Sequence, residues 1–432
     1  MTDKASAEIT LTRRQAIVGA GGLLAGGILG CGTRSKVVRE EHDAQGRRIL
    51  NFWNGFTGPD GKTMERMVQR FQDANPDITV RMQLIPWGTY YDKLTLALSY
   101  GGAPHVCVIH ANRLPEFAYY KALQPLDALY AASGTSLNQD KFAAVPWQAT
   151  FFEGKQYALP LDVHPILLYY NRRLLAKAGV SHPPTTGAEF LEAAKRLTQP
   201  SSDTSAAQWG FVFTWQRTNF LTFAAQFGGG ILTPDLKRGA MASPESVAAA
   251  QLMQDMIYKH RVAPTPEGVD AWLAFRQGKV GMALEGIYMM SSLQEQEGLD
   301  WAAAPAPQFG SRPGVWGSSH LMAQPRGITE SASRDAWRLM HFLSDNSLEW
   351  GAGGQVPART DIRNTPEFRN LSTPYQASRE LSYVVYEPLS PRANALMPFV
   401  DPAIESVLLN RETPQNAFTD ADRRMNQVLE RP

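Results

Sequence analysis

Cysteine is almost absent from this chain: its 432 residues include only two, Cys31 and Cys107. No Cys-x-x-Cys, His-Glu-x-x-His or Gly-x-Ser-x-Gly motif occurs, and the eight histidines are spread from His42 to His341. Because zinc sites and nucleophile elbows normally show such local spacing, we expect no metal, no cofactor and no nucleophilic catalysis. Cys107 lies in the apolar run 106–109, which favours a buried, inert thiol.

An excess of charge of one sign is also missing. After Arg48 the chain carries 34 basic and 36 acidic residues, a net charge of −2, and no run of lysine or arginine. A protein that binds a phosphate backbone needs a basic surface, so this composition argues against nucleic-acid binding. Phe56 stands where a phosphate-binding loop over residues 55–63 would need its first glycine, which argues against nucleotide binding.

The N-terminus has the pattern of an export signal. An arginine pair at 13–14 precedes an uncharged stretch, residues 16–30, that is too short and too weakly apolar to span a membrane. The pair suggests the twin-arginine route, and the stretch ends in Ile-Leu-Gly-Cys, which resembles a bacterial lipoprotein cleavage box with Cys31 as the acylated residue. We predict a signal peptide over 1–30 and a polar tether over 31–47. An ordinary signal peptide with an incidental cysteine is the alternative.

Beyond residue 48 the apolar pattern alternates between strands and helices. In chain order we expect a strand over 49–53, a helix capped by Asp60, a strand over 78–84, a helix over 90–99 and a strand over 105–109. This β–α–β–α–β order implies a parallel sheet with right-handed crossovers. Ligands bind outside the carboxyl ends of such strands, where Asn54, Phe56 and His110 fall.

The pattern recurs later in the chain. Further helices are expected over 186–198, 244–259 with Ser243 as the cap, 268–277, around 336–343 and around 418–428, with strand-like runs at 166–170 and 280–284. Two α/β lobes accommodate this order better than one long sheet.

Aromatic rings and hydrogen-bonding groups occur together at several predicted turns. These turns hold Trp53 and Asn54, Trp87, Trp147, Asp162 to His164, Trp215, Glu285 to Tyr288, and Trp316 to His320. A sugar presents an apolar face to a ring and hydroxyl groups to polar side chains, so the combination favours a carbohydrate ligand. Each aromatic residue taken singly is more often part of a core.

At these residues the chain resembles the extracellular carbohydrate-binding proteins of ABC importers, which include maltose-, trehalose- and oligosaccharide-binding proteins. The resemblance covers about residues 49–430. Its markers, in order, are residues 52–59, 97–104, 123–127, 154–160, 169–171, 275–282 and 354–359. The lipoprotein-like leader points the same way independently.

The resemblance implies an α/β fold, a type II periplasmic-binding-protein clamshell whose two discontinuous lobes enclose a ligand cleft. We expect the chain to cross between the lobes near residues 160–164, 315–320 and 344–346. The N-terminal lobe would then comprise 48–161 and 319–344, and the C-terminal lobe 163–316 and 346–430.

The resemblance also implies which residues contact the ligand. His110 follows the third strand and His164 stands seven residues before the asparagine of the Tyr-Tyr-Asn marker; family members commonly carry an acid at both positions. Tyr288, with Glu285 beside it, is the expected stacking residue, and Arg359 follows the third crossing, where its alternative role is a surface ion pair. The full set of candidate ligand-binding residues is Asn54, Phe56, His110, Asp162, His164, Trp215, Glu285, Tyr288, Trp316, Ser318, His320 and Arg359.

Taken together, the sequence predicts a monomeric lipoprotein that is exported and anchored to a membrane by its lipid. It would bind a sugar or oligosaccharide with high affinity and deliver it to the permease subunits of an ABC transporter, without performing catalysis. One alternative is a secreted glycoside hydrolase that uses Asp162 and Glu285 as its paired carboxylates. Another is a sensory or scaffold lipoprotein that keeps the fold but has no ligand.

Overall fold

A computed structural model describes residues 40–129, 138–200, 207–267 and 270–431 of the chain. The chain divides into two units, Met1–Lys36 and Val37–Pro432. The predicted signal peptide, the predicted lipid attachment at Cys31 and the first part of the predicted tether lie outside the described residues. Within the described ranges, no helix is both long enough and apolar enough to cross a membrane.

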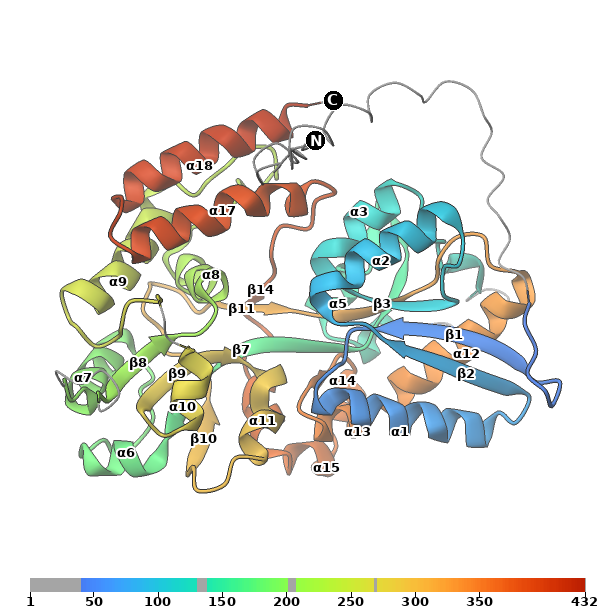
Figure 1. Cartoon of the computed structure of the whole chain (residues 1–432), viewed down its shortest axis with the longest axis horizontal. Coiled ribbons are helices and arrows are strands. Elements are labelled where there is room, and N and C mark those ends of the chain that lie inside the picture. The colour runs from blue at the N-terminus through green and yellow to red at the C-terminus, as the bar shows by residue number, and fades with distance from the viewer. Residues whose placement is uncertain (1–39, 130–137, 201–206, 268–269, 432) are drawn as a thin grey trace, which may run out of the picture. The chain divides into compact units, whose positions relative to one another are not determined.

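The first sheet has five strands in the order β2-β1-β3-β12-β6 (Figure 1). They are β1 (Arg48–Asn54), β2 (Ile78–Leu84), β3 (Val106–His110), β6 (Ala158–Pro160) and β12 (His320–Ala323). Strand β1 lies between β2 and β3 and pairs in parallel with both, which confirms the predicted β–α–β–α–β unit. β12 joins from far along the chain, antiparallel to β3 and β6.

Helices α1 (Pro59–Ala74) and α2 (Trp87–Tyr100) connect the three parallel strands. The predicted cap at Asp60 is wrong, because Gly58 occupies the N-cap and the helix begins at Pro59, a residue favoured in the first turn. Asp60 lies inside that turn and accepts a hydrogen bond from Gly61 N. The predicted cap at Ser243 is confirmed: its hydroxyl accepts a hydrogen bond from Ser246 N at the start of α9.

The second sheet is built around one long strand. Its order is β14-β11-β7-β9-β8, with β10 and β13 also paired to β7. The strands are β7 (Asp162–Asn171), β8 (Trp209–Phe213), β9 (Val280–Gly286), β10 (Trp301–Ala304), β11 (Val315–Ser318), β13 (Val356–Pro357) and β14 (Val384–Val385). A separate two-stranded hairpin consists of β4 (Phe151–Phe152) and β5 (Lys155–Gln156).

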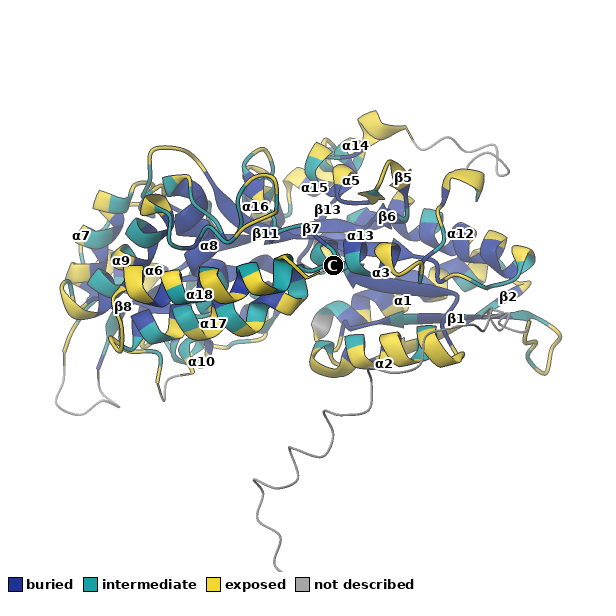
Figure 2. Ribbon diagram, turned by 90° about the horizontal axis from the view of Figure 1, so that it is seen from above, coloured by how far each residue is buried: buried dark blue, intermediate teal, exposed yellow. Residues whose placement is uncertain are grey.

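The other helices surround these sheets. They are α3 (Leu114–Tyr119), α5 (Ala144–Gln148), α6 (Arg172–Lys177), α7 (Gly187–Leu197), α8 (Gln216–Phe227), α9 (Pro244–Tyr258), α10 (Ala271–Arg276), α11 (Met290–Gln294), α12 (Glu330–Asp345), α13 (Ser347–Ala352), α14 (Thr360–Arg363), α15 (Pro366–Arg369), α16 (Ser372–Ser378), α17 (Ala393–Leu408) and α18 (Pro414–Leu429). Buried strands lie beneath helices whose outer faces are exposed (Figure 2). The hydrophobic clusters divide between the two sheets.

Cys107 is fully buried in β3, as predicted. Burial raises the pKa of its thiol to about 12, because the apolar surroundings disfavour the thiolate. The thiol is therefore a core group without nucleophilic character.

The chain passes between the sheets at single residues. Leu161 separates β6 from β7, and Ser319 separates β11 from β12. In Figure 1, β7 and β11 extend from the second sheet toward the strands of the first. Trp350 and Ala358 pack in a core cluster of the first sheet. Strand β13, which lies between them in the chain, pairs with β7 of the second sheet. The segment after Asn346 therefore contacts both sheets. The lobe boundaries given above remain a prediction.

Candidate functional site

A buried carboxylate marks the point where the sheets meet. Asp162 Oδ1 accepts hydrogen bonds from His320 N at 2.9 Å and from His164 Nδ1 at 3.3 Å. Its Oδ2 accepts from His320 Nδ1 and from Trp350 Nε1, both at 2.7 Å. A carboxylate has about four acceptor positions, so all of those of Asp162 are filled by the protein. The residue positions its neighbours and offers no free acceptor to a ligand.

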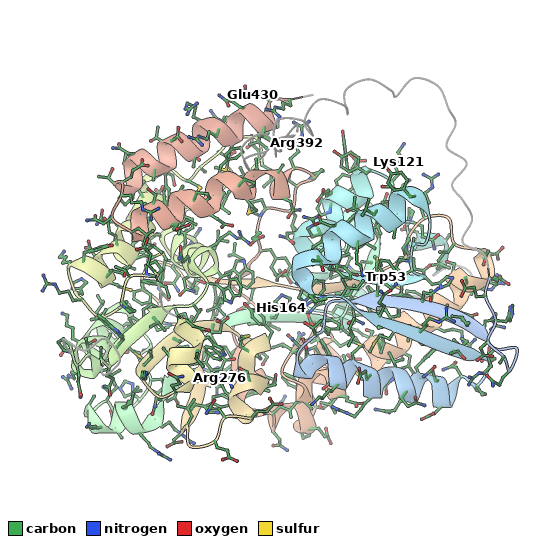
Figure 3. The ribbon with its side chains drawn as sticks, in the orientation of Figure 1. Trp53, Lys121, His164, Arg276, Arg392 and Glu430 are labelled. Carbon is green, nitrogen blue, oxygen red and sulfur yellow. The ribbon has the colours of Figure 1, made fainter. Side chains whose placement is uncertain are left out.

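Three of the candidate histidines converge beside this carboxylate. His110 ends β3, His320 begins β12 and His164 lies in β7, where Figure 3 labels it. The ring of His320 lies 4.4 Å from that of His164 and 5.0 Å from that of His110, measured between centroids. Sequence spacing gave no sign of this cluster. The expectation of no metal rested on local motifs, which do not detect such a cluster, because strand pairing joins residues far apart in the chain.

Aromatic rings from both sheets enclose the histidines. From the first sheet, Phe56 contacts His320 edge-on at 4.8 Å, and Trp87 stacks on the same imidazole at 5.7 Å with an interplanar angle of 13°. From the second sheet, Tyr288 and Trp316 lie 5.8 and 6.3 Å from the ring of His164. The arrangement supplies flat apolar surfaces around a polar centre.

Several buried polar atoms of the candidate residues lack a hydrogen-bond partner. They include Asn54 Nδ2 and Trp316 Nε1, which are donors, and Glu285 Oε2. Leaving a buried polar group unpaired costs about 1–3 kcal/mol, so native structures rarely tolerate it without a reason. Three of the twelve candidate residues carry such an atom.

Burial and neighbouring charges shift the pKa values of the site in different directions. Burial opposes ionisation of Asp162, but the neighbouring imidazole of His320 and the hydrogen bonds from His164 and His320 outweigh it and hold the pKa of the carboxyl well below its usual range. Burial lowers the pKa of His164 and, more strongly, that of His110. Burial raises the pKa of Glu285 to about 7. Near neutral pH the Asp162 carboxyl is therefore ionised, whereas the Glu285 carboxyl is partly protonated.

Three other candidates lie differently from what the resemblance implies. Ser318 pairs with His164 in the β11–β7 ladder. Trp215 caps α8 and is 58% exposed, outside the packed cluster. Arg359 is not brought into the cluster, because its guanidinium is held by Asp345 and Asp361. These ion pairs favour the ion-pair alternative for Arg359, and its contact with a ligand stays a prediction.

Sequence reasoning also missed some members of the site. Trp87 stands among the aromatic turns but was left out of the candidate set, although it follows the carboxyl end of β2, at the edge where ligands were expected. Tyr91, whose hydroxyl lies 2.5 Å from His110 Nδ1, carries no local signal. Trp350 carries none either, since its role depends on α13 packing against the first sheet.

Two hydrogen bonds join the part of the chain around the first sheet to the part around the second sheet. Asn112 Nδ2 donates to Glu387 Oε2 at 2.5 Å, and Asn394 Nδ2 of α17 donates to Glu116 Oε2 of α3 at 3.1 Å. A cavity of about 550 Å³ lies elsewhere, between β10 and the segment 183–185. None of the candidate residues lines it, and several of them form the packed cluster instead.

Comparison with known families places this geometry in context. The family model of the bacterial extracellular solute-binding proteins matches residues 56–347. The chain belongs to this family. This solute-binding protein is 21% identical over 399 residues to the maltotriose-binding protein of Pyrococcus abyssi. The match covers 89% of this chain and 82% of that protein. It is 22% identical over 428 residues to the sn-glycerol-3-phosphate-binding periplasmic protein UgpB of Shigella dysenteriae, covering 90% and 94% of the two chains.

A solved structure confirms the fold of this solute-binding protein. The ABC substrate-binding protein Lmo0181 of Listeria monocytogenes, in complex with cycloalternan, superposes with a TM-score of 0.78 at 22% sequence identity. The match covers 88% of this chain and 98% of that one. The predicted two-lobed α/β clamshell is therefore confirmed, and the histidine cluster lies where its sheets meet.

The raised pKa of Glu285 predicts a pH-dependent stability. Its folded pKa of about 7 exceeds the value of about 4.3 expected in the unfolded chain. Glu285 therefore contributes stability that is fully present below the unfolded pKa and is lost as pH rises through about 7. We therefore expect the difference in free energy of unfolding between Glu285→Gln and the parent to change in favour of the variant as the pH rises from about 4 to about 8. Urea titrations at several pH values measure this difference.

The exposed Glu297→Gln is the matched control and should track the parent at every pH. A difference between Glu285→Gln and the parent that stays constant across this range would contradict the assignment.

Proposed function

We propose that this protein binds a sugar or oligosaccharide outside the cytoplasm, as a monomer, and delivers it to the permease subunits of an ABC importer. Membership of the extracellular solute-binding family supports binding and export. The maltotriose-binding relative and the structural neighbour solved with cycloalternan support the carbohydrate class.

The observation that carries the proposal is the set of unpaired buried groups among aromatic rings. Asn54 Nδ2 and Trp316 Nε1 need acceptors, and Glu285 offers an acceptor when ionised and a donor when protonated. A sugar hydroxyl both donates and accepts, so one chemical class satisfies all of them. The C–H face of the same sugar suits the rings of Phe56 and Tyr288.

Ligand entry requires the halves to separate. The candidate residues Asp162, His164 and Glu285 are buried, and no solute reaches them while the contacts between the halves persist. A clamshell that opens and closes around the crossings solves this problem, because ligand contacts made from both lobes favour the closed form. Trp215, exposed near the end of β8, is then a contact for the outer part of a longer sugar.

The hydrolase alternative loses support at Asp162. A glycosidase nucleophile or base needs a carboxylate oxygen free to reach substrate or water. Both oxygens of Asp162 are filled by His164, His320 and Trp350. The pKa values of Asp162 and Glu285 shift in opposite directions, as those of an acid and a base in a glycosidase do. Because both oxygens of Asp162 are already hydrogen-bonded, we assign this residue a positioning role.

Lipid anchoring is part of the same proposal. A protein that hands solute to a membrane permease gains from being held at the membrane surface. The leader ending at Gly30, followed by Cys31 and a polar stretch, supports attachment through an acylated cysteine. One lipid chain alone binds membranes only marginally, so stable attachment needs the several chains that a lipoprotein carries.

A thermal-shift screen tests the function directly. The panel contains mono- and oligosaccharides, with sn-glycerol-3-phosphate included because one relative binds it. A ligand at 100 times its Kd stabilises the protein by about 2.7 kcal/mol. We expect at least one sugar to raise the melting temperature and to be recovered unchanged by chromatography after long incubation. Stabilisation by no sugar would contradict the carbohydrate assignment, and turnover that disappears in Glu285→Gln would establish the hydrolase.

Trp316→Ala should weaken binding of the identified sugar by roughly 1–3 kcal/mol, the range known for aromatic stacking on nucleobases. The variant removes both a ring and an unpaired donor at the second crossing. Calorimetry gives the affinity, and Trp272→Phe serves as the control because Trp272 packs in another cluster of the second sheet. If Trp316→Ala lowers the melting temperature but leaves the affinity unchanged, Trp316 is a core residue only.

Cys31→Ala should leave the exported domain folded but release it from the membrane. The cysteine is the predicted acylation site, and the substitution removes the thiol to which the lipid is attached. Membrane fractionation followed by immunodetection measures the distribution, with Cys107→Ala as the control. An unchanged distribution of Cys31→Ala between soluble and membrane fractions would contradict lipid anchoring.

A further inference from the structure

Three imidazoles from three distant segments present ligand atoms to one point. One ring nitrogen of each of His110, His164 and His320 lies within 4.8 Å of the others. His164 and His320 are almost completely buried, and His110 is half-buried. A hydrogen-bonding site for a sugar needs no such mutual approach of three imidazoles, whereas a metal ion requires it.

Strand pairing fixes this convergence. In the first sheet, His320 of β12 stands directly opposite His110 of β3. In the second sheet, Ser318 of β11 stands opposite His164 of β7, and only Ser319 separates β11 from β12. The histidines therefore lie on rigid strands, which hold ligand atoms more firmly than loops do.

A second shell of hydrogen bonds orients each ring. The Nδ1 atoms of His164 and His320 face the ionised carboxylate of Asp162, which only accepts, so both nitrogens carry the proton and donate. In the neutral ring the other nitrogen, Nε2, then has a free lone pair. The Tyr91 hydroxyl oxygen, which also accepts a hydrogen bond from His110 N, lies 2.5 Å from His110 Nδ1, and a His110 ring that donates to this oxygen through Nδ1 keeps its Nε2 lone pair free.

This arrangement matches the way metalloproteins prepare histidine ligands. Such ligands almost always engage their second nitrogen with a carboxylate, a backbone carbonyl or another oxygen, and this contact fixes the tautomer and the ring orientation. Trp350 extends the shell by donating to Asp162. A cluster formed by chance packing does not require a carboxylate that two imidazole rings share and whose acceptor positions are all filled.

From this geometry we propose that His110, His164 and His320 bind a divalent transition-metal ion of the zinc class. Imidazole nitrogen suits zinc, copper, cobalt and nickel, whereas magnesium and calcium take oxygen ligands. Three protein nitrogens leave a fourth position on a tetrahedral ion for water or for an oxygen of a bound solute. On such an ion, ligand nitrogens stand about 3.3 Å apart, so binding would draw the rings slightly closer.

The site would also join the two sheets. His110 and His320 belong to the first sheet and His164 to the second, so an ion held by all three favours the closed arrangement. The proposal goes beyond sugar binding and does not depend on it, and its test uses no sugar.

The test titrates metal into the untagged exported protein after treatment with EDTA. Isothermal calorimetry with zinc chloride should show one equivalent bound, and cobalt should give the visible absorption bands of a nitrogen-coordinated ion. His110→Phe keeps an aromatic ring at a half-buried position and should lower zinc affinity at least 100-fold. Tyr91→Phe, which removes only the second-shell hydroxyl, should lower it about 10–100-fold.

His341→Ala is the matched control, because this histidine pairs with Asp345 on α12, away from the cluster, and its loss should leave zinc affinity unchanged. Circular dichroism checks that each variant is folded, and Tyr91→Phe gives a second reading if His110→Phe does not fold. Zinc binding that is lost in His110→Phe and retained in His341→Ala supports the site. A parent that binds no zinc or cobalt, or an affinity unchanged in both His110→Phe and Tyr91→Phe, would overturn it.

Discussion

The buried carboxylate of Asp162 holds together the segments on which the site depends. It stands one residue after the first crossing, and it accepts hydrogen bonds from His320, just after the second crossing, and from Trp350, beyond the predicted third. An unpaired charge in such a place would be strongly destabilising, whereas one with four donors is compensated. The same bonds fix the imidazole orientations, so the architecture of the crossings and the chemistry of the site share one ionised group.

Strand order explains why functional side chains gather here. The carboxyl ends of the parallel strands β1, β2 and β3 bring Asn54, Trp87 and His110 to one edge of the first sheet. β12 then enters antiparallel beside β3, which places its first residue, His320, at that same edge. The second sheet contributes His164 through β7, the strand to which most of its other strands pair. Each lobe therefore supplies part of the site.

Much of the fold was predictable because it depends on local pattern. The run from β1 to β3, the cap at Ser243 and the buried Cys107 follow from periodicity and helix-start chemistry. The convergence of three histidines was not predictable, since β12 pairs with β3 about 210 residues earlier in the chain and no spacing rule spans that distance. For Arg359 the resemblance suggested a ligand contact, whereas the structure shows its guanidinium paired with Asp345 and Asp361, as the ion-pair alternative expected.

In the function proposed above, the unpaired atoms of the site would control closure of the lobes. In the closed arrangement Asn54 Nδ2 and Trp316 Nε1 are buried without acceptors, and each such group costs free energy that water would repay on opening. Against this stand the contacts that close the halves, such as the hydrogen bond from Asn112 to Glu387 and the stacking of Trp87 on His320. A solute that satisfies the unpaired atoms removes the cost only in the closed state, and this difference in affinity is what a binding protein needs to close on its ligand. The same polar atoms that weaken the empty closed form therefore make closure depend on the solute.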